Sequence, residues 1–147
     1  LGSENSLEDR KKFMTQVFLF WVLGATDGHA KNFSIFLLPN GSFHLTPAYD
    51  IISADPILKS KRETVMAMAA RGKNRHRKWN GIFQRHWLST AKKCKFPESE
   101  MSQIMDRIVG DMDRVIDTVG NNLPENFPDN VAAPIFDGMK SAKESIG

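Results

Sequence analysis

The chain has 147 residues, of which 41% are hydrophobic and 25% are charged, so its size and composition fit one globular domain. Its formal charge of +3 indicates no particular class of partner, and its single cysteine, Cys94, excludes a disulfide framework and a cysteine-rich metal site. The single cysteine fits a reducing cytosol, so we expect a cytoplasmic protein, and the longest apolar run, Val17 to Leu23, is too short to cross a bilayer, so we expect no membrane partner.

The first predicted element is a helix from about Leu7 to Leu23. Ser6 can cap its start, and acidic residues in its first turn suit the positive end of the helix dipole. Apolar residues become denser along the segment, which predicts that the later turns are buried on nearly all sides. Gly24 marks the end of the helix and releases the chain into a loop.

This loop, Gly24 to Asn32, contains Asp27 and Asn32 in the pattern D-x-x-x-x-N. The spacing is typical of protein-kinase catalytic loops, in which the Asp accepts the proton of the attacking hydroxyl and the Asn binds magnesium together with a second Asp. Magnesium in ATP sites takes one or two carboxylates, and water and phosphate oxygens complete its shell. Asp50, eighteen residues after Asn32, is the natural second carboxylate.

The segment between these residues predicts a β-hairpin. Residues 33–38 and 42–45 are rich in strand-forming side chains, and Pro39-Asn40-Gly41 between them is a strong turn signal. A hairpin returns the chain to its starting point. We therefore expect Asp50 to lie beside Asn32, where both can bind one cation.

After Asp50 the pattern is weaker. Residues 64–70 fit a short buried strand or a weak helix, and Arg71 to Lys78 form a basic cluster. Such a cluster is typical of a solvated loop. No aromatic residue lies within it to stack on bases, so contact with a nucleic-acid backbone is the less favoured alternative.

Helical periodicity returns in the C-terminal half. We predict helices over about 79–93, 97–120 and 130–145. The first of them has an apolar face formed by Ile82, Phe83, Trp87 and Ala91. The predicted fold is therefore mainly α with one small β-hairpin.

Each candidate site residue also has a simpler interpretation. Asp27-Gly28 is a common turn pair, His29 can satisfy a loop carbonyl, and Lys31 can be a solvated charge. His44, His76 and His86 lack the spacing of metal ligands, so we interpret them as structural or exposed. The combination of Asp27, Asn32 and Asp50 around a hairpin favours the functional interpretation for those three.

Three segments resemble one known family, and they are Gly24 to Leu38, Tyr49-Asp50-Ile51 and Ala91 to Glu98. They are similar to the C-terminal lobe of HipA-type serine/threonine kinases, the toxins of bacterial toxin–antitoxin pairs. The similarity covers most of the chain and is densest from Val22 to Pro56. It implies that the whole chain, residues 1–147, forms a single domain equivalent to the C-terminal lobe of a protein-kinase-like fold.

The resemblance also implies roles for individual residues. Asp27 becomes the catalytic base, Asn32 and Asp50 the magnesium ligands, and His29 and Lys31 contacts to the phosphates of ATP or to Asp27. Members of the family phosphorylate protein serines, aminoacyl-tRNA synthetases among them, and a small DNA-binding antitoxin, HipB in type, inhibits them. DNA contact would then come indirectly, through the antitoxin complex.

The sequence begins without methionine, and the residues before Asp27 contain no Gly-rich phosphate loop and no strand-borne Lys. We therefore expect a fragment without the N-terminal ATP lobe, which alone transfers phosphate poorly or not at all. Two hypotheses follow: an enzyme lobe that acts with ATP and magnesium, or a non-catalytic helical module that docks an antitoxin or DNA.

Overall fold

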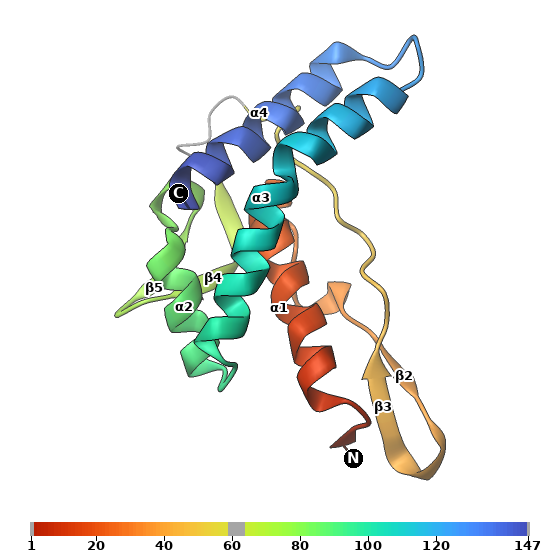
Figure 1. Ribbon diagram of the computed structural model, residues 1–147, viewed down its shortest axis with the longest axis vertical. Helices are drawn as coiled ribbons and strands as arrows, with labels where there is room; N and C mark the ends of the chain where they lie inside the picture. The colour runs from red at the N-terminus through yellow and green to blue at the C-terminus, as the bar shows by residue number, and fades with distance from the viewer. Residues whose placement is uncertain (1, 59–63, 147) are drawn as a thin grey trace.

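The computed structural model describes residues 2–58 and 64–146 (Figure 1). These residues are mainly helical, with helices α1 (Ser6–Val22), α2 (Gln84–Lys93), α3 (Glu98–Asn122) and α4 (Asp129–Ile146). The strands are short and are β1 (Gly2–Ser3), β2 (Ile35–Leu37), β3 (Ser42–Leu45), β4 (Val65–Arg71) and β5 (Arg75–Lys78). In the described part of the chain they form two small sheets, in the orders β1-β3-β2 and β4-β5.

Helix α1 is the central element of the core. Its cap is Asn5 rather than the predicted Ser6, because the Asn5 side chain accepts a hydrogen bond from the Glu8 N–H. Its last turns are buried as expected, and Phe18, Phe20 and Trp21 are at most 1% exposed. The Phe18 and Trp21 rings pack against Trp87 of α2, and Trp21 also stacks on Trp79, so α1 joins the N-terminal and C-terminal parts of the fold.

The predicted hairpin is present as β2 and β3. Ile35 pairs with Leu45 and Phe36 with His44, and the turn between the strands contains Asn40 and Gly41 in left-handed conformations. Strand β1, which we did not predict, pairs with β3 in parallel.

The Asp9 carboxylate fixes this three-stranded sheet to α1. It accepts hydrogen bonds from the Ser3 hydroxyl, at 2.5 Å, and from the Leu45 N–H, at 3.0 Å. Burial raises the pKa of Asp9, but these two hydrogen bonds and the nearby Lys12 and His44 outweigh it, so the net pKa is lowered.

The basic segment 71–78 is a hairpin and not the predicted solvated loop. Strands β4 and β5 pair antiparallel, which also decides the open choice for residues 64–70 in favour of a strand. Met66 and Ala70 of β4 are buried in the core, so β4 provides the apolar side of the hairpin and β5 the charged side. We refer to β4 and β5 together as the basic ribbon, and Figure 1 shows it projecting from the body beside α2.

Helix α2 begins at Gln84, five residues later than predicted from Trp79. Trp79 belongs to a separate 3-10 turn, Trp79–Gly81, in which its ring stacks on Trp21 at 5.2 Å. The two indole N–H groups donate reciprocally, Trp21 to the Trp79 carbonyl and Trp79 to the Trp21 carbonyl. These bonds hold Trp79 outside the helix, and Phe83, placed on the apolar face by the pattern, is 37% exposed.

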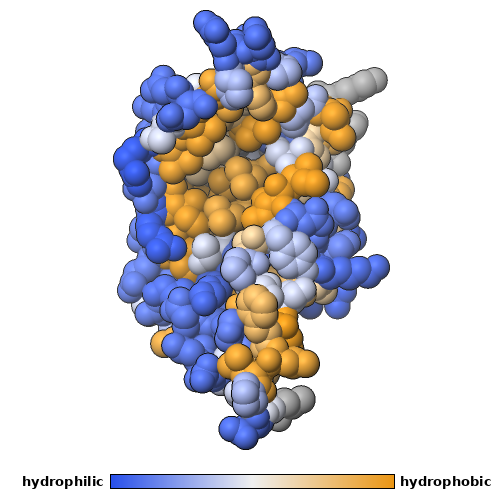
Figure 2. Space-filling view, turned by 90° about the vertical axis from the view of Figure 1, so that its right-hand side faces the viewer, coloured by the Kyte–Doolittle hydropathy of each residue, from blue (hydrophilic) through white to orange (hydrophobic). Residues whose placement is uncertain are grey.

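Helices α3 and α4 form an antiparallel pair whose far ends extend beyond the body as an arm (Figure 1). Predicted and observed ends agree within about two residues. Large apolar side chains of β2, the segment 49–57 and α3 are exposed. Figure 2 shows a broad, hollowed apolar area on the face that lies at the right of Figure 1. In the described residues, no helix is both long and apolar enough to cross a membrane.

Candidate functional site

The loop that carries Asp27 rests directly on the core. It begins at Gly24, whose left-handed conformation (φ +60°) turns the chain away from α1. A β-carbon at Gly24 would lie 2.6 Å from the Asp55 carboxylate, and one at Gly28 would lie 2.4 Å from the Phe20 ring. The loop is also bonded to the basic ribbon, because the Ala67 N–H donates to the Thr26 carbonyl at 2.9 Å. Glycines and the ribbon thus fix the backbone on both sides of Asp27.

Asn32 is the buried centre of the site, with 4% of its surface exposed. Its side-chain oxygen accepts a hydrogen bond from the His29 N–H at 2.9 Å, and its side-chain nitrogen donates to the Asp50 carboxylate at 2.5 Å. The Asn32 carbonyl accepts from the buried Gln16 side chain of α1 at 3.1 Å. Helix, loop and returning hairpin therefore meet at one residue.

Asp50 reaches Asn32 because the β2–β3 hairpin brings the chain back, as the turn signal predicted. It is exposed and has a left-handed backbone (φ 56°), which is uncommon for a residue other than glycine. Tyr49, directly before it, donates a hydrogen bond from its hydroxyl to the Lys31 carbonyl at 3.1 Å. Asn32 and Asp50 are eighteen positions apart, and the segment between them thus closes into a short, hydrogen-bonded loop.

Asp27, His29 and Lys31 lie on the solvent side of this loop. The Asp27 side chain is 94% exposed, and one of its oxygens lies 3.7 Å from Nε2 of His29. This separation is longer than a hydrogen bond, so His29 is a neighbour of the Asp27 carboxylate and not its hydrogen-bond partner. Lys31 is exposed, as the simpler interpretation of a solvated charge expects.

The chemistry of the Asn32–Asp50 pair fits magnesium held together with phosphates. Its potential ligands are a carboxylate and an amide oxygen, both hard donors, and the His29 N–H occupies one acceptor position of that amide oxygen. In the described residues no group of three or more His, Cys, Asp or Glu side chains converges as a metal site would require. Such a cation would need other oxygens, which fits metal bound with a nucleotide better than a site made of protein ligands alone.

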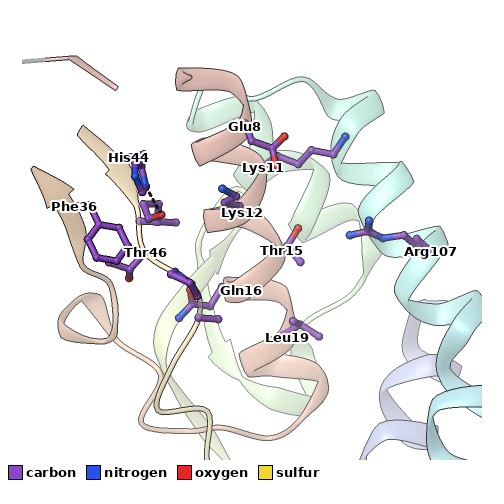
Figure 3. Close-up of a pocket in the computed structure, with 13 residues that line it drawn as sticks. Glu8, Lys11, Lys12, Thr15, Gln16, Leu19, Phe36, His44, Thr46 and Arg107 are labelled. Carbon is purple, nitrogen blue, oxygen red and sulfur yellow. Dashed lines mark hydrogen bonds between the residues drawn. The ribbon is translucent and has the colours of Figure 1, made fainter. Parts of the chain in front are cut away.

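A cavity of about 720 Å³ lies behind the site, between α1, β3 and α3 (Figure 3). Gln16 lines it and also donates to the Asn32 carbonyl, while Pro47 and Ala48 line it just before Asp50. Lys12 and Arg107 contribute positive charge to its wall. Sequence reasoning missed Gln16, although a lone amide among the apolar last turns of α1 was a usable signal.

A second feature outside the loop is a strongly basic surface. Nine of the twenty Lys and Arg residues lie between residues 64 and 97, a stretch without any Asp or Glu. Within residues 2–58 and 64–146 none of these nine side chains forms an ion pair with a carboxylate. We define them as the basic surface: Arg71, Lys73, Arg75, Arg77, Lys78, Arg85, Lys92, Lys93 and Lys95.

Comparison with known proteins places this arrangement in a family. Residues 1–116 match the family model described as the HipA-like C-terminal domain. Among solved structures, the chain resembles one from the complex of Shewanella oneidensis MR-1 HipA and HipB with operator DNA, with a TM-score of 0.82 and 22% identity. The match covers 98% of this chain and 33% of that chain, so the likeness shows a shared fold over a third of the solved chain's length. The match over residues 1–116 shows that the chain belongs to the family of HipA-like C-terminal domains.

Proposed function

We propose that this chain is the catalytic-loop lobe of a HipA-type serine/threonine protein kinase and takes part in transfer of the γ-phosphate of ATP to a protein serine. The observation that carries the proposal is the 2.5 Å hydrogen bond between Asn32 and Asp50, which joins the two proposed magnesium ligands across eighteen residues. The exposed Asp27 on the same loop supports it, because a catalytic base must reach a hydroxyl on another protein.

In this proposal Asp27 accepts a hydrogen bond from the serine hydroxyl, aligns it for attack and takes its proton. His29 lies 3.7 Å from the Asp27 carboxylate, near enough to contact the phosphates beside it, and Lys31 faces solvent where it can meet phosphate. Asn32 and Asp50 would hold the magnesium that binds with ATP. That ion supplies charge neutralisation at the transferring phosphate. The regulating partner proposed is a HipB-like antitoxin, and aminoacyl-tRNA synthetases are the substrate class that family membership suggests.

The test is phosphate transfer by the complete protein carrying Asp27→Asn. Removing the base should lower the rate of transfer to protein serine by about 10²- to 10⁴-fold without changing the melting temperature, because Asp27 packs against nothing in the core. Asp137→Asn is the matched control, since it removes an exposed carboxylate from α4. A rate for Asp27→Asn equal to that of Asp137→Asn would refute the role of Asp27.

The basic surface favours a second candidate function, direct binding to the phosphate backbone of duplex DNA. Its cations have no carboxylate partners in the described residues, so they are available to an external polyanion. The major groove of B-form DNA admits a two-stranded ribbon. The tip of the basic ribbon is Gly72-Lys73-Asn74, which offers no aromatic ring for single-stranded bases and no apolar group for a membrane.

This second function predicts salt-dependent binding that requires the basic surface. Binding of labelled duplex DNA by the complete protein, without antitoxin, is followed by fluorescence anisotropy from low to moderate salt. Replacing Lys73, Arg75 and Lys92 by Gln should reduce the slope of log K against log salt by about two to three. Replacing Arg107, Arg114 and Lys140 removes equal charge elsewhere and should change it less. Equal effects, or binding only to anionic vesicles or acidic protein, would refute DNA contact.

A further inference from the structure

The hydroxyl group of Tyr49 bridges the two sides of the proposed metal pair. It lies 3.1 Å from the Lys31 carbonyl and 2.8 Å from the Ser34 hydroxyl. A phenol has one hydrogen, and a carbonyl can only accept, so Tyr49 donates to Lys31 and Ser34 must donate to Tyr49. The result is a directed chain of hydrogen bonds from Ser34 through Tyr49 to the main chain of the catalytic loop.

This chain of hydrogen bonds continues the register of the hairpin beyond its last backbone pair. Ile35 pairs with Leu45, and the Thr46 N–H donates to the Ser34 carbonyl. The next residue, Pro47, has no N–H, so the backbone ladder cannot simply extend. Tyr49 lies opposite Lys31 in the same register, and its side-chain hydroxyl, in place of a backbone N–H, donates the hydrogen bond to the Lys31 carbonyl.

The position of this bond matters because Lys31 and Tyr49 directly precede Asn32 and Asp50. The Tyr49–Lys31 and Asn32–Asp50 hydrogen bonds both join residues eighteen apart, and they lie next to each other along the chain. Asn32 is independently held, because it is buried and bonded to Gln16 and His29. Asp50 is exposed and has an uncommon backbone conformation. Its position therefore depends on the neighbouring hydrogen bond from Tyr49 to the Lys31 carbonyl.

Burial of the ring does not explain why a tyrosine occupies position 49. Its side chain belongs to a residue that is 41% exposed, so burial of its ring contributes little compared with a core aromatic. Its specific contacts are the two hydrogen bonds of its hydroxyl. A phenylalanine would keep the ring and lose both bonds, so Tyr49→Phe isolates the hydroxyl's role.

We propose that Tyr49 is a positioning residue: its hydroxyl fixes Asp50 against the catalytic loop so that the carboxylate stays beside Asn32 for the divalent cation. Ser34 supports it by donating to the same oxygen. This inference rests on the proposed kinase function, because it assigns Tyr49 a part in the magnesium site of that kinase.

The test measures cation binding apart from catalysis. Mn²⁺ replaces Mg²⁺, and free Mn²⁺ is followed by electron paramagnetic resonance with the complete protein and a non-hydrolysable ATP analogue. Tyr49→Phe should weaken Mn²⁺ binding by about three- to tenfold, which is the scale of one lost net hydrogen bond. The Mg²⁺ concentration for half-maximal transfer should rise equally, with the rate at saturating Mg²⁺ and the melting temperature nearly unchanged.

Two further variants sharpen the result. Ser34→Ala leaves the Tyr49–Lys31 bond in place and should have a smaller effect than Tyr49→Phe. Thr118→Val removes a hydroxyl bonded to the Arg114 carbonyl on α3 and should have none. If Tyr49→Phe binds Mn²⁺ like the wild type, or slows transfer equally at every Mg²⁺ concentration, the positioning role is wrong. If Asp50→Asn leaves Mn²⁺ binding unchanged, the proposed magnesium site itself fails.

Discussion

Gly28 shows how closely a single residue couples the loop that carries Asp27 to the core. A β-carbon there would lie between 2.4 and 2.8 Å from atoms of the Phe20 ring, which is itself 1% exposed. The ring cannot retreat without opening the core, because interiors are closely packed. Asp27 is therefore exposed to solvent, while Gly28, the next residue, packs directly against the buried Phe20 ring.

Gly28→Ala should destabilise the protein and displace Asp27. We expect the free energy of unfolding, measured in urea, to fall by about 1–3 kcal/mol, as in other overpacked cores. Gly110→Ala is the matched control, since a β-carbon at Gly110 in α3 meets nothing within 4 Å. In a helix interior that change should stabilise by up to about 1 kcal/mol. Equal responses of the two variants would contradict the tight contact with Phe20.

At this scale the sequence identified residues whose types and spacing carry meaning by themselves. The pattern of Asp27, Asn32 and Asp50 could be read from the chain, and so could the turn that brings Asp50 beside Asn32. Gln16 and Tyr49 could not be assigned, because their importance lies in which atoms they reach. A glutamine in a helix and a tyrosine in a loop have many alternative partners until the fold selects one.

Among the elements, the basic ribbon is joined to α2 by two stacked imidazole rings. His76 of β5 and His86 of α2 have ring centroids 3.8 Å apart and an interplanar angle of 14°. His86 is 5% exposed, and its Nδ1 accepts a hydrogen bond from the Phe83 N–H, so the neutral form is required there. Burial lowers the pKa of His86, and the neighbouring His76 and Arg85 lower it further.

This lowered pKa predicts a loss of stability in mild acid. The unfolded chain takes up a proton near the ordinary value of about 6.5, whereas the folded protein does so only at lower pH. The free energy of unfolding should therefore fall as the pH drops below about 6.5 and stay level above it. His86→Asn keeps an acceptor for the Phe83 N–H without titrating, so urea unfolding at pH 7.5 and 5.5 should show a smaller difference than in the wild type.

The same measurement distinguishes His86 from Asp9, the other group with a shifted pKa. Asp9 also has a shifted pKa, but that pKa is lowered from about 3.8, so the stability Asp9 contributes is lost only in stronger acid. The two groups therefore act in separate pH ranges. An equal loss of stability between pH 7.5 and 5.5 in wild type and His86→Asn would exclude His86 as its source.

Helices and strands could be predicted where the apolar periodicity was long. The prediction failed where tertiary contacts determined whether an element forms or where it begins. Helices α1, α3 and α4 follow their patterns closely, because α3 and α4 each carry a sustained apolar stripe and the last turns of α1 are apolar on nearly all sides. Strand β5 has no apolar residue, and it forms because β4 beside it supplies the buried side. The start of α2 was misplaced because the reciprocal Trp21–Trp79 hydrogen bonds, invisible in sequence, hold the intervening turn out of the helix.

Across the whole molecule, positive and negative charges lie in different parts of the sequence, which the net charge alone does not reveal. Eleven Lys and Arg residues lie outside the stretch 64–97, and all seventeen Asp and Glu residues lie outside it too. The formal charge of +3 is thus the sum of a basic ribbon region and an acidic remainder. The proposed catalytic loop lies on the acidic remainder but is bonded to the ribbon through Thr26 and Ala67.

The hairpin register has one more consequence, which concerns changes in chain length between Asn32 and Asp50. Adding one residue to each strand beyond Leu37 and Phe43 would lengthen the tip and leave Ile35 opposite Leu45. An insertion or deletion in only one strand would slide every later pair and carry Asp50 away from Asn32. The pairing at the base of the hairpin, and not the number of residues between Asn32 and Asp50, therefore brings the two side chains together, so changes in length should be tolerated at the tip and not within one strand.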